Sequence, residues 1–527
     1  MHAPQNRHAP DWRWPRGLKV IVLASLFFFA GCASIDYDYP RAATTADFDT
    51  ADTELGMQVA DLTASVETGH AGFFPLTRGI DALSSRLLLA ERAERTIDTQ
   101  YYLVKPDTTG FAFLHTLLQA ADRGVRVRLL LDDMFVVGRD SGLVALDAHP
   151  NFEIRVVNPF RRGIGGFVWS GLTSFSRATR RMHAKSFTVD GQVTILGGRN
   201  IADEYFGASE KAKFSDVDVI GIGPIAQDVS RMFDTYWNHA TSLPLPAFAK
   251  MPDDPQAELS RVRTYLAEAM EAARETRYAD AVTASARQFI GGDPENIVWS
   301  PYQLAYDSPD KHLGVVDDTT VSIVTPLLEA LLAAQEELII VTPYFVPGNE
   351  GIRQIIELEK RGVDVTIVTN SLVANNHTAV HGGYSPARKP LLSNGVRIFE
   401  VKPNAEIAGT EFVDAADATA TLHTKAFFVD RDISFIGSFN FNQRSVNRDS
   451  ESGVIIESSK ISGGFTDAIE SALGTKAWEV FLDGEGKLRW RGYEDGEEVV
   501  YTKEPEASWF MRFKATLARI LPIKSQL

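Results

Sequence analysis

One short pattern occurs twice in this chain, and it constrains the possible fold more than any other feature of the sequence. Both copies read His-x-Lys, four residues, Asp, six residues, then Gly-(Gly/Ser)-x-Asn, and they begin 240 residues apart. The first copy contains His183, Lys185, Asp190 and Asn200, and the second contains His423, Lys425, Asp430 and Asn440. Identical spacing at two distant places indicates a duplicated half-site, because polar residues on ordinary exposed strands would not repeat in this way.

Each copy of the motif is predicted to form a tight β-hairpin. Asp190-Gly191 and Asp430-Arg431 stand between two apolar runs, where such residues favour a turn. With the first turn centred between residues 190 and 191, cross-strand pairing places Gly198 opposite His183, and Ser438 falls opposite His423 in the same way. These small residues are expected to leave room for a substrate atom beside each His, with Asn200 and Asn440 as amide donors at the lip.

The residue types of the motif favour chemistry at an anionic phosphorus centre. An imidazole supplies a nucleophile or an acid, and ammonium and amide groups donate charge-assisted hydrogen bonds to phosphate oxygens. We therefore predict a catalytic motif that needs no cofactor and no metal ion. Asp190 and Asp430 belong to the motif, and their turn positions predict side-chain hydrogen bonds that hold each hairpin.

The paired pattern resembles the phospholipase D superfamily, whose members carry two such motifs in one active site. The resemblance extends from about Gly72 to the C-terminus and is closest to the bacterial cardiolipin synthase C type. It implies that one His attacks the phosphorus of a phospholipid while the other protonates the leaving alcohol, without deciding which His attacks. It also implies that a carboxylate of one repeat orients the His of the other, with Glu451 serving His183 and Asp216 serving His423. Asp218 is a further candidate carboxylate.

Two similar series of predicted strands and helices accompany the two motifs. Strand 96–104, helix 111–122 and strand 125–131 correspond to strand 338–344, helix 352–360 and strand 363–369. This order predicts an α/β fold of two α/β/α repeats, with mainly parallel sheets, a pseudo-twofold axis and an active site at the repeat interface. The resemblance implies that both repeats are phospholipase D-like. The predicted bounds are 71–240 and 296–475 for the repeats, 241–295 for a helical connector, and 476–527 for C-terminal strands and an amphipathic helix.

The first 70 residues are predicted to attach the protein to a membrane. Basic residues precede the apolar run 20–30, which is too short to span a bilayer but typical of a signal peptide. Cys32, the only cysteine, follows small residues as in a bacterial lipoprotein, so residues 1–31 are expected to be removed and Cys32 lipidated. The alternative is a short uncleaved membrane anchor. Residues 32–70 are expected to form a flexible tether, which places the enzyme in the bacterial cell envelope, facing the periplasm, with the outer membrane favoured.

The charge of the chain disfavours a nucleic-acid partner. The formal net charge is −16, and about −19 remains once the basic leader is removed. Proteins that follow a nucleic-acid backbone need a basic surface. The acidic charge therefore counts against the nuclease branch of the superfamily. We expect phospholipid substrates and a membrane surface as partners.

Two further segments are candidates for lipid contact. His381, Tyr384 and Arg388 follow a predicted strand end in the second repeat, where ligands of open α/β sheets bind, and are expected to recognise a lipid headgroup. In the C-terminal helix, Trp509, Phe510, Phe513, Leu517 and Ile520 share one stripe. That stripe suits either a membrane surface or packing on the domain's own sheet.

The leading hypothesis is a phosphatidyltransferase of cardiolipin synthase type. It would move a phosphatidyl group through a phosphohistidine to a hydroxyl of phosphatidylglycerol, with phosphatidylglycerol or phosphatidylethanolamine as the donor. The alternatives are a hydrolytic phospholipase D or another phosphodiesterase, including a nuclease, and a catalytically inactive lipid-binding lipoprotein. The sequence leaves open whether water or a lipid is the acceptor, which oligomer forms, and whether a protein partner is required.

Overall fold

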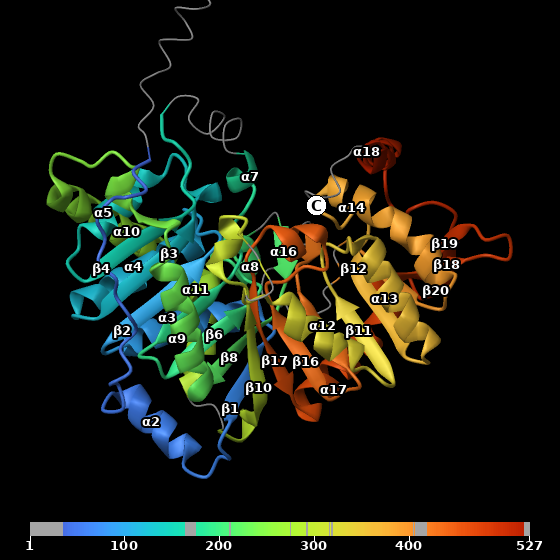
Figure 1. Cartoon of the computed structure of the whole chain (residues 1–527), viewed down its shortest axis with the longest axis horizontal. Coiled ribbons are helices and arrows are strands. Elements are labelled where there is room, and N and C mark those ends of the chain that lie inside the picture. The colour runs from blue at the N-terminus through green and yellow to red at the C-terminus, as the bar shows by residue number, and fades with distance from the viewer. Residues whose placement is uncertain are drawn as a thin grey trace, which may run out of the picture.

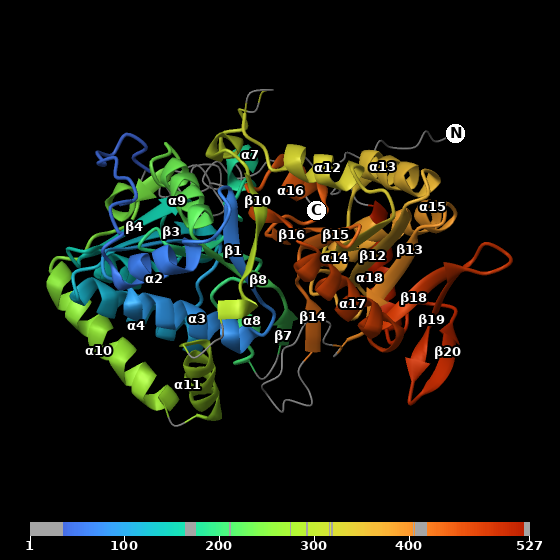
Figure 2. The ribbon, with the colours of Figure 1, turned by 90° about the horizontal axis from the view of Figure 1, so that it is seen from below.

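The computed structural model describes residues 35–163, 175–209, 212–274, 276–290, 294–315, 317, 320–403, 405 and 419–520. These residues form two α/β repeats that lie side by side, as Figures 1 and 2 show in views at right angles. The leader and Cys32 fall outside the described residues. Among the described residues, no helix has the length and apolar composition needed to cross a membrane.

The first repeat, its connector and the second repeat contain the following elements. The first repeat has β1 (His70–Leu76), α3 (Gly79–Arg92), β2 (Thr96–Tyr101), α4 (Thr108–Asp122), β3 (Arg126–Asp132), α5 (Asp140–Asp147), β4 (Phe152–Val157), α7 (Phe175–Ala178), β5 (Ser186–Val189), β6 (Val193–Gly197), α8 (Asp203–Phe206), β7 (Ala212–Ser215), β8 (Asp218–Ile222), α9 (Pro224–Trp237) and β9 (Ser242–Pro244). The connector has α10 (Pro255–Arg274) and α11 (Arg277–Ile290). The second repeat has β10 (Val298–Tyr306), α12 (Val324–Leu332), β11 (Glu337–Val341), α13 (Gly348–Lys360), β12 (Asp364–Asn370), α14 (Thr378–Tyr384), α15 (Arg388–Leu392), β13 (Arg397–Val401), β14 (Thr419–Leu422), β15 (Ala426–Val429), β16 (Ile433–Gly437), α16 (Gln443–Asn447), β17 (Ser452–Glu457) and α17 (Ser459–Lys476), followed by β18 (Ala477–Leu482), β19 (Leu488–Glu494), β20 (Glu497–Tyr501) and α18 (Trp509–Ile520).

Each repeat is built on three parallel strands, β2-β3-β4 in the first and β11-β12-β13 in the second. The motif hairpins β5-β6 and β15-β16 add antiparallel strands, and β8 and β17 continue them. Strands β1 and β10 pair with each other across the pseudo-twofold axis and join both halves into one sheet. The two-repeat α/β fold is confirmed, but the sheet is mixed rather than mainly parallel, because every repeat adds an antiparallel hairpin to its parallel core.

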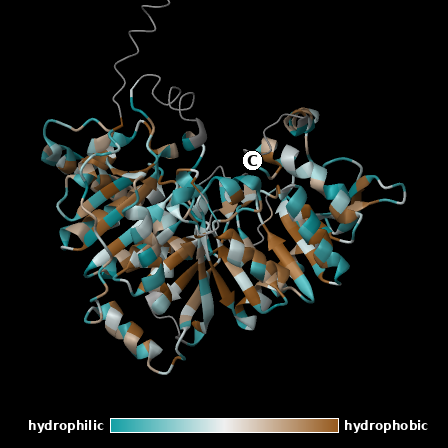
Figure 3. Cartoon of the chain, viewed as in Figure 1, coloured by the Kyte–Doolittle hydropathy of each residue, from teal (hydrophilic) through white to brown (hydrophobic). Residues whose placement is uncertain are grey.

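Apolar strands and amphipathic helices explain this layering. Six of the seven residues of β3 are buried, and the same holds for β12. Strands buried on both faces read as nearly continuous apolar runs, whereas the covering helices keep a polar outer face. Figure 3 shows the result, with hydrophobic strands in the interior and mostly hydrophilic or mixed colours on the outer helices.

Residues 35–63 pack on the first repeat, so the prediction of a flexible tether is wrong for the described part of that segment. Buried Arg128 donates to the backbone oxygen of Thr44 at 3.0 Å, and buried Arg155 donates to that of Ala42 at 2.7 Å. Helix α2 (Glu54–Thr63) adds the buried Leu55. A buried guanidinium is costly without acceptors, which explains why this segment is fixed on strands β3 and β4.

The two connector helices cover the outer helices of the first repeat. Helix α11 packs on α3, where the Ser84 hydroxyl donates to the backbone oxygen of Val282 at 3.0 Å. Helix α10 packs on α4 and α5, and Arg263 of α10 forms an ion pair with Asp122. The connector therefore closes one face of the first repeat rather than lying between the repeats (Figure 2).

The motif carboxylates Asp190 and Asp430 anchor neighbouring strands. Asp190 accepts backbone N–H bonds from Glu94, Arg95 and Thr96 at 3.1, 2.8 and 2.8 Å, at the start of β2. Asp430 accepts the equivalent bonds from residues 335, 336 and 337 at the start of β11. Both therefore have structural positions at the far end of the strand from the motif His, and they hold an adjacent strand rather than their own hairpin.

Replacing Asp190 with Ala should lower the free energy of unfolding by about 3 kcal/mol, because three backbone donors lose a shared acceptor. The change should appear as a lower urea midpoint in circular dichroism. Asp432, an exposed residue of the second hairpin, provides a matched control, and its replacement with Ala should change stability by less than about 0.5 kcal/mol. Equal effects of the two substitutions would contradict the anchoring role.

Candidate active site

A short parallel pairing between the repeats brings His423 beside Asp216. Strands β7 and β14 pair so that Ser215 lies next to Leu422, and the following residues are Asp216 and His423. The backbone N–H of His423 donates to the Ser215 oxygen at 2.7 Å. The His423 Nδ1 atom then lies 2.6 Å from Asp216 Oδ2.

The same arrangement recurs at the first motif. Met182 pairs in parallel with Ser450, and the His183 backbone N–H donates to the Ser450 oxygen at 2.8 Å. The His183 Nδ1 atom lies 2.8 Å from Glu451 Oε2. This crossed arrangement is the one that the resemblance implies. Since the carboxylate beside each His comes from the other repeat, the site is complete only where the two repeats meet.

Gly198 and Ser438 do not lie beside the His of their own motif, so that prediction is wrong. The hairpin ladders pair Ser186 with Leu196 and Ala426 with Ile436, one residue away from the predicted register, and end before each His. A Cβ atom on Gly198 would lie 2.3 Å from an Asp216 oxygen. The Ser438 hydroxyl donates to Glu451 Oε2 at 2.5 Å. Each small residue therefore makes room for, or binds, the carboxylate that orients the His of the other repeat.

Both carboxylates remain ionised although they are fully buried. Burial alone would raise the pKa of Glu451, but His183, Lys185 and the Ser438 hydroxyl outweigh it and lower the pKa to about 2. Burial also opposes ionisation of Asp216, yet Lys425 and His423 keep its pKa below the usual value. Ser445, which the sequence places just after the second motif, donates a further hydrogen bond to Glu451 at 2.6 Å.

Burial lowers the pKa of both motif histidines, with Glu451 opposing this effect at His183 and Lys425 adding to it at His423. Neutral imidazoles are therefore the resting state at pH 7. A neutral imidazole that donates Nδ1–H to a carboxylate presents a lone pair on Nε2. Each His is thus prepared to act as a nucleophile or a base.

The two motif lysines are buried cations held close to the histidines. Lys185 donates to the backbone oxygen of His183, while the Lys425 Nζ atom lies 2.9 Å from Nδ1 and 3.3 Å from Nε2 of His423. Burial lowers the pKa of Lys185 to about 7 and that of Lys425 to about 8. A bound phosphate anion would favour their charged forms, because an opposite charge nearby stabilises an ammonium.

The two motif asparagines are buried and keep hydrogen-bonding capacity. Asn200 donates to the Tyr205 hydroxyl at 2.8 Å. The Oδ1 atoms of Asn200 and Asn440 have no hydrogen-bond partner among the described residues. A buried amide oxygen without a partner is unusual, and it suits a group that accepts a hydrogen bond from a substrate hydroxyl.

Aromatic residues that the sequence analysis did not identify surround the histidines unequally. Tyr102 contacts His183 edge to face with ring centroids 5.1 Å apart. The ring of His423 stacks on Phe214 at 5.2 Å and also contacts Tyr205 and Tyr344. The sequence could have identified two of these residues, because Tyr102 and Tyr344 follow corresponding strands, β2 and β11, of the two repeats.

Asp218 does not orient either motif His, although its charge acts on Lys425. It is fully buried and pairs with Arg86 at 2.8 Å and with Arg199 at 3.6 Å. Among the described residues, no cluster of three or more His, Cys, Asp or Glu side chains has the arrangement of a metal site.

The proposed headgroup residues are buried in a network of their own, so their assignment is wrong. His381, Tyr384 and Arg388 are each at most 2 % exposed. Arg388 lies 2.6 Å from His381 Nε2 and 2.9 Å from Glu400 Oε1, and Tyr384 donates to the same Glu400 oxygen at 3.0 Å. Glu504 completes the ion pairs of Arg388 at 3.2 Å. These contacts fix α14 and α15 on β13. Arg388 Nε and His381 Nδ1 have no partner among the described residues, but burial of all three side chains keeps them from a lipid headgroup at the surface.

Known proteins are similar to this chain in sequence and in fold. A family model described as "Cardiolipin synthase, PLD-like domain" matches residues 88–237 and 327–473, more than half of the chain. Cardiolipin synthase C of Escherichia coli K12 is 38 % identical over 87 % of this chain and 97 % of its own length. An uncharacterised protein of Helicobacter pylori 26695 is 26 % identical over 95 % of this chain and 98 % of its own length.

A solved structure supports the fold. The phosphatidylserine synthase of Haemophilus influenzae superimposes with a TM-score of 0.50 at 14 % identity, covering 80 % of this chain and 90 % of that chain. With the paired motifs, the crossed carboxylates and the family match at both repeats, the chain belongs to the phospholipase D superfamily and, within it, to the cardiolipin synthase family with PLD-like domains.

Proposed function

We propose that this protein is a phosphatidyltransferase of cardiolipin synthase type, which joins a phosphatidyl group to a hydroxyl of phosphatidylglycerol through a phosphohistidine. The observation that carries this proposal is the pair of buried His–carboxylate contacts at the repeat interface. The 38 % identity to a cardiolipin synthase over most of the chain supports the choice of substrate class.

In the proposed first step, His183 Nε2 attacks the phosphorus of the donor lipid and forms a P–N bond. The P–O bond to the headgroup alcohol breaks. His423 takes up a proton at Nε2 when the bound phosphate offsets the charge of Lys425, and it donates that proton to the leaving oxygen. We assign attack to His183 because its side chain is 13 % exposed and Lys185 contacts only its backbone, whereas His423 is 7 % exposed and has Lys425 against its ring.

In the proposed second step, His423 removes the proton of the incoming hydroxyl, which attacks phosphorus as the P–N bond breaks. Lys185 and Lys425 stabilise the added negative charge on the phosphate oxygens. The free Oδ1 atoms of Asn200 and Asn440 accept hydrogen bonds from headgroup hydroxyls other than the attacking one, whose proton goes to His423. With phosphatidylglycerol as acceptor the product is cardiolipin, and with water it is phosphatidic acid.

The products formed from defined lipids test the function. Purified protein given phosphatidylglycerol should form cardiolipin and release glycerol, measured by mass spectrometry. Adding phosphatidylethanolamine and detecting free ethanolamine would identify a second donor. Phosphatidic acid as the main product would replace the transferase proposal with a hydrolytic phospholipase D, and an absence of turnover would favour an inactive lipid-binding protein.

Rapid denaturation with detergent during turnover, at neutral to mildly alkaline pH where the P–N bond survives, should trap the phosphatidyl group on the peptide that contains His183, and His183→Ala should abolish the trapped species. Glu451→Gln should lower kcat by about 10²–10⁴-fold, because a neutral amide then replaces the ionised carboxylate that orients the imidazole of His183. Glu457→Gln, at the exposed end of β17, is the matched control and should retain activity. A trap on His423 would reverse the assigned roles, and no trap on either His would contradict covalent catalysis.

We also propose that the protein is held at a membrane in the bacterial cell envelope by two elements. The first is an acyl group on Cys32, which the leader pattern supports. The second is α18, which packs through Ala515 and Ala518 on Gly382 of α14. Its other face exposes four large apolar side chains, Trp509, Phe510, Phe513 and Leu517, which are between 49 % and 71 % exposed. An apolar stripe beside basic residues suits an interfacial helix.

Labelled palmitate should enter the wild-type chain but not Cys32→Ala. The Cys32→Ala protein should still float with phosphatidylglycerol vesicles, and adding Trp509→Ala with Phe513→Ala should weaken vesicle binding about tenfold or more, because buried apolar area drives insertion. Tyr493→Ala with Val500→Ala, which remove exposed apolar side chains from β19 and β20, is the control. Unchanged flotation of the α18 variant would contradict the role of this helix.

A further inference from the structure

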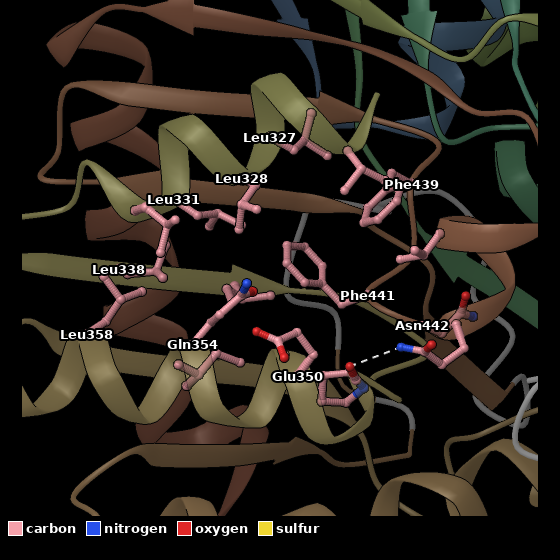
Figure 4. Close-up of a pocket in the computed structure, with 18 residues that line it drawn as sticks. Leu327, Leu328, Leu331, Leu338, Glu350, Gln354, Leu358, Phe439, Phe441 and Asn442 are labelled. Atoms are coloured by element: carbon pink, nitrogen blue, oxygen red, sulfur yellow. Dashed lines mark hydrogen bonds between the residues drawn. The ribbon is translucent and has the colours of Figure 1, made fainter. Parts of the chain in front are cut away.

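An apolar groove separates α12 from α13 in the second repeat (Figure 4). Its cavity volume is about 320 Å³, within the range of ligand pockets. Leu328 and Leu331 of α12 face Leu358 of α13, and Leu338 of β11 lies at the floor. Ile355 of α13 also lines the groove. The gap therefore reaches through the helix layer down to the sheet.

The first repeat closes the equivalent gap with its own chain. There α3 and α4 pack directly on each other, and α10 and α11 cover them. Ile201, which follows Asn200 in the first motif, is completely buried, whereas its counterpart Phe441 is only partly buried and lines the groove. In the described part of the second repeat, nothing corresponds to the connector helices.

The surface around the groove is unsuited to a protein partner. The outer face of α13 carries Arg353, Glu357 and Lys360, each between 58 % and 73 % exposed. Glu329 of α12 is exposed as well. The gap between the helices is largely apolar, with Glu350 and Gln354 of α13 as polar lining residues. Desolvating the charges on the outer faces under a docked helix would be costly. A thin uncharged chain fills such a gap without covering the charged ridges.

The groove has a polar end near the catalytic motif. Gln443 donates to the backbone oxygen of Pro347 at 3.1 Å, which joins the beginning of α16 to the beginning of α13. Asn442 accepts from the Ser445 backbone N–H at 2.8 Å and so caps α16, and the Ser445 hydroxyl donates to Glu451. Phe439 and Phe441 of the lining flank the motif residue Asn440. One end of the groove is therefore connected through Ser445 to the carboxylate that orients His183.

We propose that this groove binds one acyl chain of a phospholipid, with the ester end of that chain near Asn442 and Gln443 and the methyl end near Leu331 and Leu358. This site rests on the proposed function, since it assumes a phospholipid as the molecule that the enzyme meets. It adds a binding site for the chain of the lipid, lined in part by Phe439 and Phe441 of the second motif loop. Aliphatic walls with a few polar groups at one end match the chemistry of an acyl ester.

Photolabelling tests this site without requiring turnover. The probe is phosphatidylglycerol with a diazirine near the end of one acyl chain, added to the full chain and to its His183→Ala variant. Adducts are expected on the peptides of α12 and α13 in both proteins. Leu331→Trp and Gln354→Trp fill the groove from opposite walls and should each lower labelling about tenfold, as expected when buried methylenes lose their site. Val321→Trp, an exposed residue before α12, should leave labelling unchanged.

Each outcome of this experiment decides between alternatives. Labelling elsewhere, or labelling that both Trp variants leave unchanged while their melting temperatures match the parent protein, would overturn the proposal. A diazirine fatty acid that labels the groove when the phospholipid probe does not would overturn the phospholipid as the source of the chain. Because His183→Ala cannot complete transfer, groove labelling in that variant stands apart from the proposed reaction, and either proposal can fail alone.

Discussion

The two hydrogen bonds that cross between the repeats are the interactions on which the rest of this structure depends. Glu451 orients His183, and Asp216 orients His423, so each half of the chain completes the site of the other. Side-chain contacts alone would place such pairs loosely. Here the backbone pairs first, Ser215 with Leu422 and Met182 with Ser450, and the next residue on each side is the catalytic one. The joined sheet β8-β1-β10-β17 holds this geometry from below.

Burial gives this arrangement its chemical value. In water, a carboxylate and an imidazole would exchange partners freely, but in a dehydrated site their orientation is set before substrate arrives. The same burial weakens the protonation of Lys185 and Lys425 until an anion is present. The buried lysines therefore lower the stability of the folded protein while the site is empty, and a bound phosphate restores it by favouring their charged forms. Carboxylates in structural positions, such as Asp190 with its three backbone donors, contribute to the stability that tolerates this cost.

The sequence predicted the duplication, the strand and helix order, and the crossed pairing, because motif spacing and family resemblance carry that information. It did not predict the hairpin register. Val189 pairs with Val193 around a three-residue turn in which Asp190 and Gly191 both have positive φ, and a single-residue slip moves every side chain to the other face. Nor did it predict that His381, Tyr384 and Arg388 are buried, because their acceptor Glu400 lies inside the apolar strand β13 and no local pattern marks it as their partner.

The two repeats share a motif but not its surroundings, and a two-step transfer benefits from this difference. Identical histidines would compete for the same role. Phe214, Tyr205, Tyr344 and the Lys425 ammonium surround His423, whereas Tyr102 is the aromatic contact of His183. A cation at the imidazole disfavours its protonated form until the phosphate arrives and offsets the charge, which couples acid catalysis to substrate binding. The more open His183 keeps Nε2 available for attack. The residues around the two motifs differ, although the motifs themselves are repeated. This difference in surroundings supplies the distinction between nucleophile and acid that the duplicated motif does not contain.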